Sequence, residues 1–344
     1  MLDSYNHLSR RGFLSSTLAV GAGLALGKST FGYQPRMELA ESDKALVVIC
    51  LDLEMSRHFP KRGMTEWDFQ KGNLNEKTKQ YTVEASRRVK AKGGVLHSFV
   101  VGRVLEQANV DWLKQIIDDG HPLGNHTYDH VRVTAQKIED VQYRFGRSPW
   151  LLAGRTPAQA IAENIRLCET AMQERLDFRP IGFTAPYGFK EGLNGREDVQ
   201  EIFLSLGFKW VSTKYKGIPN LPRTNPGPDV FERAAEIQAE HQPYFYPTGL
   251  LEIPNSPMSD VSAFRSLDWT VDEFCQAQEA GIKWAIDHGG IYNWTGHPSI
   301  QYVKDPEFRA IEHMCDVVNE SGGKAAIVGR DVVAQRVFLQ QEKN

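Results

Sequence analysis

Short apolar runs alternate with amphipathic helical segments along most of this chain, and this alternation limits the folds that it can adopt. Residues 45–53 (ALVVICLDL) form a continuous apolar run, which is typical of a strand buried on both faces of a parallel sheet. Residues 75–92 then have a helical pattern, and residues 94–101 (GVLHSFVV) form a second apolar run. Such βαβα order predicts an α/β fold with a parallel sheet, either open or closed into a barrel.

The same order continues toward the end of the chain. We expect further helices over residues 110–119, 158–176, 197–206, 270–288 and 305–322. We expect strands over residues 181–185, 208–213, 250–254, 291–294 and 325–328, and residues 331–339 complete the alternation. Two long stretches, 55–72 and 215–247, interrupt it, and loops of such length usually serve a function. We therefore expect these two loops to shape a cleft.

The composition is that of a soluble globular protein and excludes several classes. The chain has 344 residues, of which 41% are hydrophobic and 24% charged, and its net charge is −3. This charge gives no sign of a nucleic-acid partner, which would require a basic patch. The four cysteines show no Cys-x-x-Cys spacing, so we expect buried thiols rather than a zinc finger or a disulfide framework. No feature of the sequence fixes the oligomeric state.

The N-terminus resembles a bacterial twin-arginine export signal. Arg10 and Arg11 precede a mildly apolar run over residues 18–26. This run is too short for a stable membrane span, which needs about 20 residues. We therefore predict a signal segment over residues 1–35, a catalytic domain over residues 40–340, and a periplasmic or cell-envelope location.

Two histidines and two carboxylates point to a metal site. His126 and His130 are four residues apart, so their rings lie one helical turn apart or on one side of a tight turn. Asp52 and Glu54 end the first predicted strand and share one of its faces. Two carboxylates on one face disfavour each other's ionisation unless a cation lies beside them. The four residues therefore predict a metal-binding site, with His58 as an alternative ligand.

The sequence GHPLGNHTYDH over residues 120–130, preceded by Val101-Gly102-Arg103, resembles the second motif of polysaccharide deacetylases of the carbohydrate esterase 4 type. With weaker matches, the resemblance covers about residues 45–335. It implies a single-domain, distorted (β/α)7-type barrel. It also implies a metal-dependent hydrolase of amide C–N bonds that removes acetyl groups from an N-acetylated polysaccharide or oligosaccharide.

The resemblance implies a role for each residue of the metal site. His126 and His130 match the metal-binding histidines of the family, and Asp52 matches its catalytic base. The family usually has two consecutive aspartates at the first motif, whereas this chain has Asp-Leu-Glu, so Glu54 becomes the expected third ligand. The metal that suits two histidines and a carboxylate in a hydrolase is zinc.

The resemblance also implies the residues that act opposite the base. His297, followed by Pro298, matches the catalytic acid, and Asp268, beside Trp269, matches the residue that orients this acid. Tyr187 matches a residue whose backbone N–H stabilises the oxyanion.

Position 184 departs from the family pattern. The third motif normally carries an arginine that pairs with the catalytic aspartate, and this chain has Thr184 there. The departure leaves two alternatives open. One is an allantoinase-like hydrolase of small cyclic amides or ureides on the same scaffold, and the other is a glycan-binding protein with a degenerate site.

Overall fold

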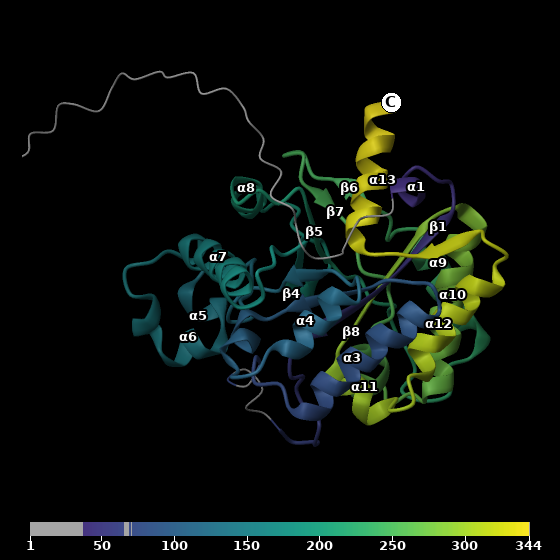
Figure 1. Cartoon of the computed structure of the whole chain (residues 1–344), viewed down its shortest axis with the longest axis horizontal. Coiled ribbons are helices and arrows are strands. Elements are labelled where there is room, and N and C mark those ends of the chain that lie inside the picture. The colour runs from purple at the N-terminus through teal and green to yellow at the C-terminus, as the bar shows by residue number, and fades with distance from the viewer. Residues whose placement is uncertain (1–36, 65–68, 70, 344) are drawn as a thin grey trace, which may run out of the picture. The chain divides into compact units, whose positions relative to one another are not determined.

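The computed structural model describes residues 37–64, 69 and 71–343 (Figure 1). In these residues a mostly parallel sheet is curled into a half-barrel, which confirms the expected single-domain, distorted (β/α)7-type barrel. The predicted signal segment, 1–35, lies outside the described residues.

The sheet has the strand order β6-β7-β5-β4-β3-β2-β1-β8 in the described part of the chain, and β9 pairs with β1. Every pairing is parallel except that of β6 with β7. The strands are β1 (Ala45–Leu53), β2 (Leu96–Val100), β3 (Leu123–Asn125), β4 (Phe183–Phe189), β5 (Trp210–Lys214), β6 (Tyr244–Phe245), β7 (Leu251–Glu252), β8 (Ile291–Gly296) and β9 (Ala325–Ile327).

Helices cover the outer side of the curled sheet (Figure 1). The α-helices are α1 (Met37–Ala40), α3 (Glu76–Ala91), α4 (Asp111–Asp118), α5 (Ile138–Val141), α6 (Tyr143–Arg147), α7 (Pro157–Leu176), α8 (Glu197–Ser205), α9 (Pro228–Gln238), α10 (Val271–His288), α11 (Pro298–Lys304), α12 (Arg309–Glu320) and α13 (Arg330–Lys343). Shorter turns are η1 (Gly102–Glu106), η2 (Pro149–Leu152) and the π-helical η3 (Val261–Ser266).

The predicted bounds of β1 are confirmed at both ends. The other predicted strands and helices are present, and most of their bounds agree with the prediction within a few residues. The capping box that opens α10 is also present, since Thr270 Oγ1 accepts from Glu273 N and the Glu273 carboxylate accepts from Thr270 N. All four cysteines are buried and free, as expected.

Two expectations about helices were wrong. The stretch 215–247 is not one long loop, because α9 begins at Pro228 after Gly227 and buries Val230 and Ala234. The helix expected from residue 305 begins instead at Arg309. Asp305 still caps it, since its carboxylate accepts from the backbone N of Arg309 at 3.0 Å and of Ala310 at 2.8 Å.

Side chains bridge the gap between β8 and the segment that follows β7. The side-chain amide of Asn293 on β8 donates to the carbonyls of Ile253 at 3.3 Å and Pro254 at 2.9 Å. The backbone of Asn293 exchanges hydrogen bonds with Ser256, since Ser256 N donates to Asn293 O at 2.7 Å and Asn293 N donates to Ser256 Oγ at 2.9 Å. The two ends of the sheet are thereby held together without a strand ladder.

The pleat of β1 determines where its last side chains point. Leu46, Val48 and Cys50 belong to the same buried cluster as Phe99 and Trp210 from β2 and β5. Residues at odd positions of β1 pack instead against a cluster that includes residues of α3, α10 and α12. Because strand side chains alternate, Asp52 continues the face of Cys50 toward the carboxyl end of the barrel.

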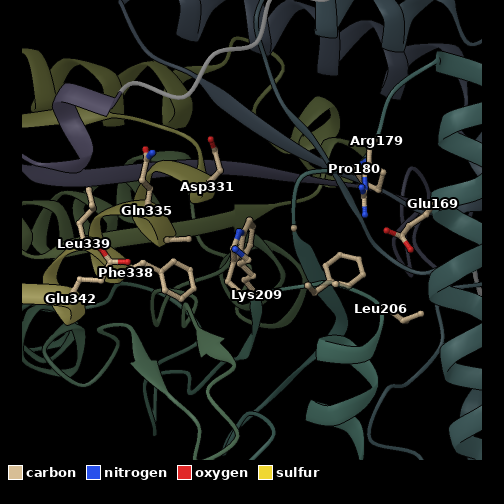
Figure 2. Close-up of a pocket in the computed structure, with 15 residues that line it drawn as sticks. Glu169, Arg179, Pro180, Leu206, Lys209, Asp331, Gln335, Phe338, Leu339 and Glu342 are labelled. Atoms are coloured by element: carbon tan, nitrogen blue, oxygen red, sulfur yellow. The ribbon is translucent and has the colours of Figure 1, made fainter. Parts of the chain in front are cut away.

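A cavity of about 670 Å³ lies at the other end of the sheet, between α13 and the residues that precede β4 and β5 (Figure 2). Gly182, Lys209 and Phe338 are among the residues that line it. The catalytic candidates follow the strands rather than precede them, so this cavity is not the candidate active site. Among the described residues, every helix is too short or too polar to cross a membrane.

Candidate active site

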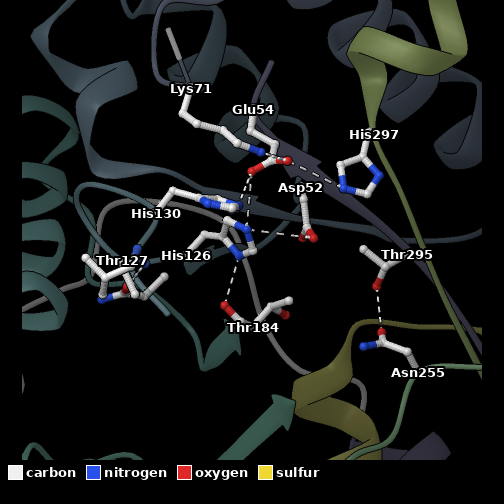
Figure 3. A network of polar contacts seen from close by, with 12 residues as sticks. Asp52, Glu54, Lys71, His126, Thr127, His130, Thr184, Asn255, Thr295 and His297 are labelled. Atoms are coloured by element: carbon white, nitrogen blue, oxygen red, sulfur yellow. Dashed lines mark hydrogen bonds and ion pairs between the residues drawn. The ribbon is translucent and has the colours of Figure 1, made fainter. Parts of the chain in front are cut away.

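Asp52 and Glu54 lie at the carboxyl end of β1, and both side chains are almost fully buried. Figure 3 shows that these carboxylates, two imidazoles of one loop and the imidazole of His297 converge. The structure thus brings together the residues that the sequence predicted for the metal, the base and the acid.

The two histidines are positioned by a tight turn after β3 rather than by a helix. Asn125 Oδ1 accepts from Thr127 N at 2.8 Å, and Thr127 Oγ1 accepts from Val131 N at 2.9 Å. Thr127 and His130 both have left-handed backbone conformations, with φ of 59° and 60°. Such conformations are uncommon for residues other than glycine and are maintained only where the surroundings hold them. The turn aims the rings of His126 and His130 at the same point.

Glu54 completes a group of three possible metal ligands. Its Oε2 lies 2.5 Å from His130 Nε2 and 3.7 Å from His126 Nε2. The ligand atoms of the three residues all lie within 4.8 Å of one another, and all three side chains are buried. Asp52 lies slightly further away, with Oδ2 3.9 Å from His126 Nε2.

These residues fit a divalent metal by the chemistry of their atoms. His126 Nδ1 donates to the carbonyl of Thr184 at 2.9 Å, so its Nε2 carries the lone pair that a ligand needs. Glu54 Oε2 is buried and lies against the two imidazoles, 2.5 Å from His130 Nε2. Burial lowers the pKa of His130 to about 3, so its ring is neutral. Burial alone would raise the pKa of Glu54, but His130 and Lys71 hold it well below its usual value.

His297 follows β8 and is oriented by a buried carboxylate. Its Nδ1 lies 2.9 Å from Asp260 Oδ1, and its backbone N donates to Asp260 Oδ2 at 2.6 Å. Burial would lower the pKa of His297, but the charge and hydrogen bond of Asp260 outweigh it and raise the pKa above its usual value. The remaining nitrogen, Nε2, lies 3.7 Å from Glu54 Oε1. His297 can therefore hold a proton that faces the site.

The prediction that Asp268 orients His297 was wrong. Asp268 lies at the surface, where its side chain is 59% exposed and pairs with Lys304 at 3.2 Å. Its neighbour Trp269 is buried and donates to the carbonyl of Pro222, so this Asp-Trp pair is a turn followed by a core residue. The π-helical η3 separates it from Asp260, and no spacing in the sequence distinguishes Asp260 from other acidic residues.

Comparison with known proteins identifies the domain. A family model described as polysaccharide deacetylase matches residues 69–210. Over these residues the chain is similar to polysaccharide deacetylases. The comparison with curated proteins finds no match.

Two solved structures share the fold. One is a protein described as a polysaccharide deacetylase from Mycobacterium smegmatis, with a TM-score of 0.58 and 16% identity over 87% of this chain and 92% of that chain. The other, described in the same way, is from Pseudomonas aeruginosa PAO1, with a TM-score of 0.56 and 15% identity over 86% of this chain and 91% of that chain. At such identities the likeness concerns the fold of the deacetylase alone.

A buried guanidinium contacts Thr184, the residue that departs from the expected family pattern. Arg330, the first residue of α13, is fully buried, and its Nη1 donates to Thr184 Oγ1. Its other nitrogens donate to Asn293 Oδ1 at 2.8 Å, Asn255 Oδ1 at 2.7 Å and Thr295 Oγ1 at 2.5 Å. A cation in the barrel interior thus has polar partners from three segments of the chain.

Arg330 also influences the candidate base. Burial raises the pKa of Asp52, and the charges of His126, His297 and Arg330 oppose this rise. Sequence reasoning missed Arg330 because it is 146 residues beyond Thr184, and only the folded chain brings the two together.

Tyr187 lies beside the turn that carries His130. Its backbone is left-handed, with φ of 66°, at a point where the register between β4 and β5 shifts. Its ring meets that of His130 edge to face, with centroids 5.0 Å apart. The oxyanion role of its backbone N–H stays a prediction. His58, the alternative ligand, is not in the three-residue group and has its Nδ1 3.3 Å from Gly63 N.

Proposed function

We propose that this protein is a metal-dependent hydrolase that removes acetyl groups from an N-acetylated polysaccharide or oligosaccharide. The observation that carries the proposal is the buried Glu54–His126–His130 group, with the Asp52 carboxylate on one side and the His297 imidazole on the other. The polysaccharide deacetylase domain over residues 69–210 supports the substrate class.

Glu54, His126 and His130 are the residues that would hold the metal, and their chemistry favours zinc. When bound, zinc would polarise the acetyl carbonyl and lower the pKa of a water molecule toward 7. The tight turn and the hydrogen bond to the Thr184 carbonyl aim both imidazoles at one point, so little reorganisation is needed on binding.

Asp52 acts as the general base in this proposal. Its Oδ1 is buried and makes no hydrogen bond within the described residues, so this oxygen can accept a proton from the attacking water. The charges of His126, His297 and Arg330 favour its ionised form in a buried position.

His297 acts as the general acid. An amine leaves poorly unless it is protonated, and His297 Nε2 can deliver that proton while Asp260 keeps the ring oriented. The Tyr187 backbone N–H would stabilise the oxyanion by about 2.7–4 kcal/mol, which is typical of one preorganised donor.

The test is acetate release from N-acetylated oligosaccharides, measured with and without a chelator. We expect release to fall to background after chelation, to return when zinc is added, and to be absent from His126→Ala protein. Undiminished release by folded Asp52→Ala or His126→Ala protein would contradict the proposal. Ureide hydrolysis without acetate release would favour the cyclic-amide alternative.

We also propose that the protein is exported by the twin-arginine route, on the basis of Arg10, Arg11 and the apolar run that follows them. The test is the location of the full chain and of the variant with both arginines changed to lysine. Equal export of the two proteins would contradict this proposal.

A further inference from the structure

A buried lysine contacts one of the expected metal ligands. Lys71 lies in the stretch between β1 and α3, its side chain is 4% exposed, and its Nζ donates to Glu54 Oε1 (Figure 3). An ammonium group is almost never fully buried unless it is paired. The burial of this lysine beside an expected metal ligand therefore calls for an explanation.

The backbone around Lys71 is held in place on both sides. The carbonyl of Lys71 accepts from Met55 N at 3.0 Å, directly after Glu54, and the carbonyl of Phe69 accepts from Arg103 Nη1 at 3.2 Å. Gly72 packs so closely on Arg103 that a Cβ at this position would lie 2.4 Å from the Arg103 Cβ. The loop thus delivers the ammonium group to a fixed point.

The two oxygens of Glu54 have different surroundings. Oε2 faces the two imidazoles, at 2.5 Å from His130 Nε2 and 3.7 Å from His126 Nε2. Oε1 accepts from Lys71 and lies 3.7 Å from His297 Nε2. One oxygen is therefore directed at the expected metal, and the other is held by a cation.

We propose that Lys71 is a positioning residue that holds Glu54 Oε1, so that Glu54 offers only Oε2 to the metal. The inference rests on the proposed function. A carboxylate that gives one oxygen leaves a coordination position for water and substrate, which catalytic zinc sites require. Lys71 also occupies the oxygen nearest His297, and this leaves the imidazole paired with Asp260.

Charge balance supports this role. Asp52, Glu54 and Asp260 place three carboxylates in one buried region. Lys71 pairs with Glu54, and the imidazole of His297 pairs with Asp260. A buried carboxylate is costly unless it is paired, so Lys71 offsets the burial of Glu54 before any metal binds.

The experiment compares zinc affinity among variants of the full chain, measured by competition with a chromophoric chelator. Partners that hydrogen-bond to metal ligands typically contribute 10–100-fold to metal affinity, so we expect Lys71→Met to bind zinc about 10–100-fold more weakly. Lys71→Arg should recover most of this loss, because it keeps a charged donor. Lys61→Met removes an exposed lysine from the same stretch and should leave the affinity unchanged.

A second measurement separates positioning from a general effect on the fold. X-ray absorption at the zinc edge should show about one more oxygen ligand in Lys71→Met, because Glu54 is then free to bind through both oxygens. Circular dichroism and melting of the metal-free proteins establish that each variant folds. Equal or tighter zinc binding by folded Lys71→Met, or an unchanged coordination number, would overturn the inference.

The outcomes also distinguish this inference from the proposed function. If the native chain binds no zinc, or binds it equally well after His126→Ala and His130→Ala, the proposed function fails. If the native chain binds zinc through these histidines and Lys71→Met binds it equally well, only the role of Lys71 fails.

Discussion

The two sides of the active site are assembled in different ways. On the metal side, one tight turn supplies His126 and His130, and one strand end supplies Asp52 and Glu54. On the acid side, His297 depends on Asp260, which is 37 residues away. Arg330 comes from the start of α13 and meets Thr184 across 146 residues. Site residues that lie close together in the sequence can be recognised from their spacing. Site residues that come from distant segments can be recognised only in the folded structure.

The largest expected effect tests the acid side. Asp260→Asn should lower kcat by about 10²–10⁴-fold, because a misoriented and less basic imidazole no longer protonates the leaving amine. Asp268→Asn is the matched control and should stay within about twofold, as is usual for a surface substitution. A strong loss in Asp268→Asn with native activity in Asp260→Asn would reverse the assignment of these aspartates.

The pH profile of Asp260→Asn tests whether Asp260 also raises the pKa of His297. Burial lowers the pKa of His297, and Asp260 outweighs this and raises it, so the protonated acid persists to higher pH in the native protein. Without the Asp260 charge the pKa falls, and the alkaline limb of kcat/KM should move to lower pH. An unmoved alkaline limb would mean that another group sets it.

Arg330→Met should have the next largest effect. Removing this charge raises the pKa of Asp52 further, so the acidic limb of the profile should move to higher pH. Activity on the acidic side of the limb should fall about tenfold for each pH unit by which the limb moves. The variant also leaves buried polar partners, and its unfolding free energy should fall by roughly 3–5 kcal/mol. Arg330→Lys keeps the charge, so its acidic limb should move less than that of Arg330→Met. Equal displacement of the limb in the two variants would contradict an electrostatic role for Arg330.

The effect of zinc on the melting temperature should distinguish variants of the metal side from variants of the acid side. Zinc at 100 times its Kd stabilises the folded chain by about 2.7 kcal/mol, so a chelator should lower the melting temperature of the native protein. Asp260→Asn should keep this response and His126→Ala should lose it, because only the latter removes a ligand. Scanning calorimetry measures both. Loss of the response in Asp260→Asn would show that the two sides are not independent.

Thr184→Ala should have the smallest effect. It removes one hydroxyl that accepts from the charged Arg330, and a hydrogen bond to a charged group contributes about 1.5–3 kcal/mol. Activity should fall by less than about tenfold, and zinc affinity should not change, because His126 donates to the Thr184 carbonyl rather than to its side chain. A loss of zinc affinity, measured by chelator competition, would contradict this distinction.

The sequence predicted most of the order of strands and helices, because most buried strands and amphipathic helices have their own periodic pattern. It missed α9 and short elements such as β3 and α11. It also predicted that Glu54, His126 and His130 would meet, since the carboxyl ends of parallel strands share one edge. It could not predict Asp260, Arg330 or Lys71 as parts of the site. Their positions follow from a π-helical turn, the entry of α13 into the barrel and the path of a long loop.

The hydrogen bond from His126 to the Thr184 carbonyl has a consequence for how such sites diversify. A main-chain carbonyl is present whichever residue occupies the position, so a substitution at 184 alters the surroundings of the base without disturbing the tautomer of the ligand. In this chain a guanidinium reaches the Thr184 side chain from the start of α13. In a relative that lacks the motif arginine, a compensating cation should therefore be looked for in the folded structure, around the candidate base, rather than in the motif itself.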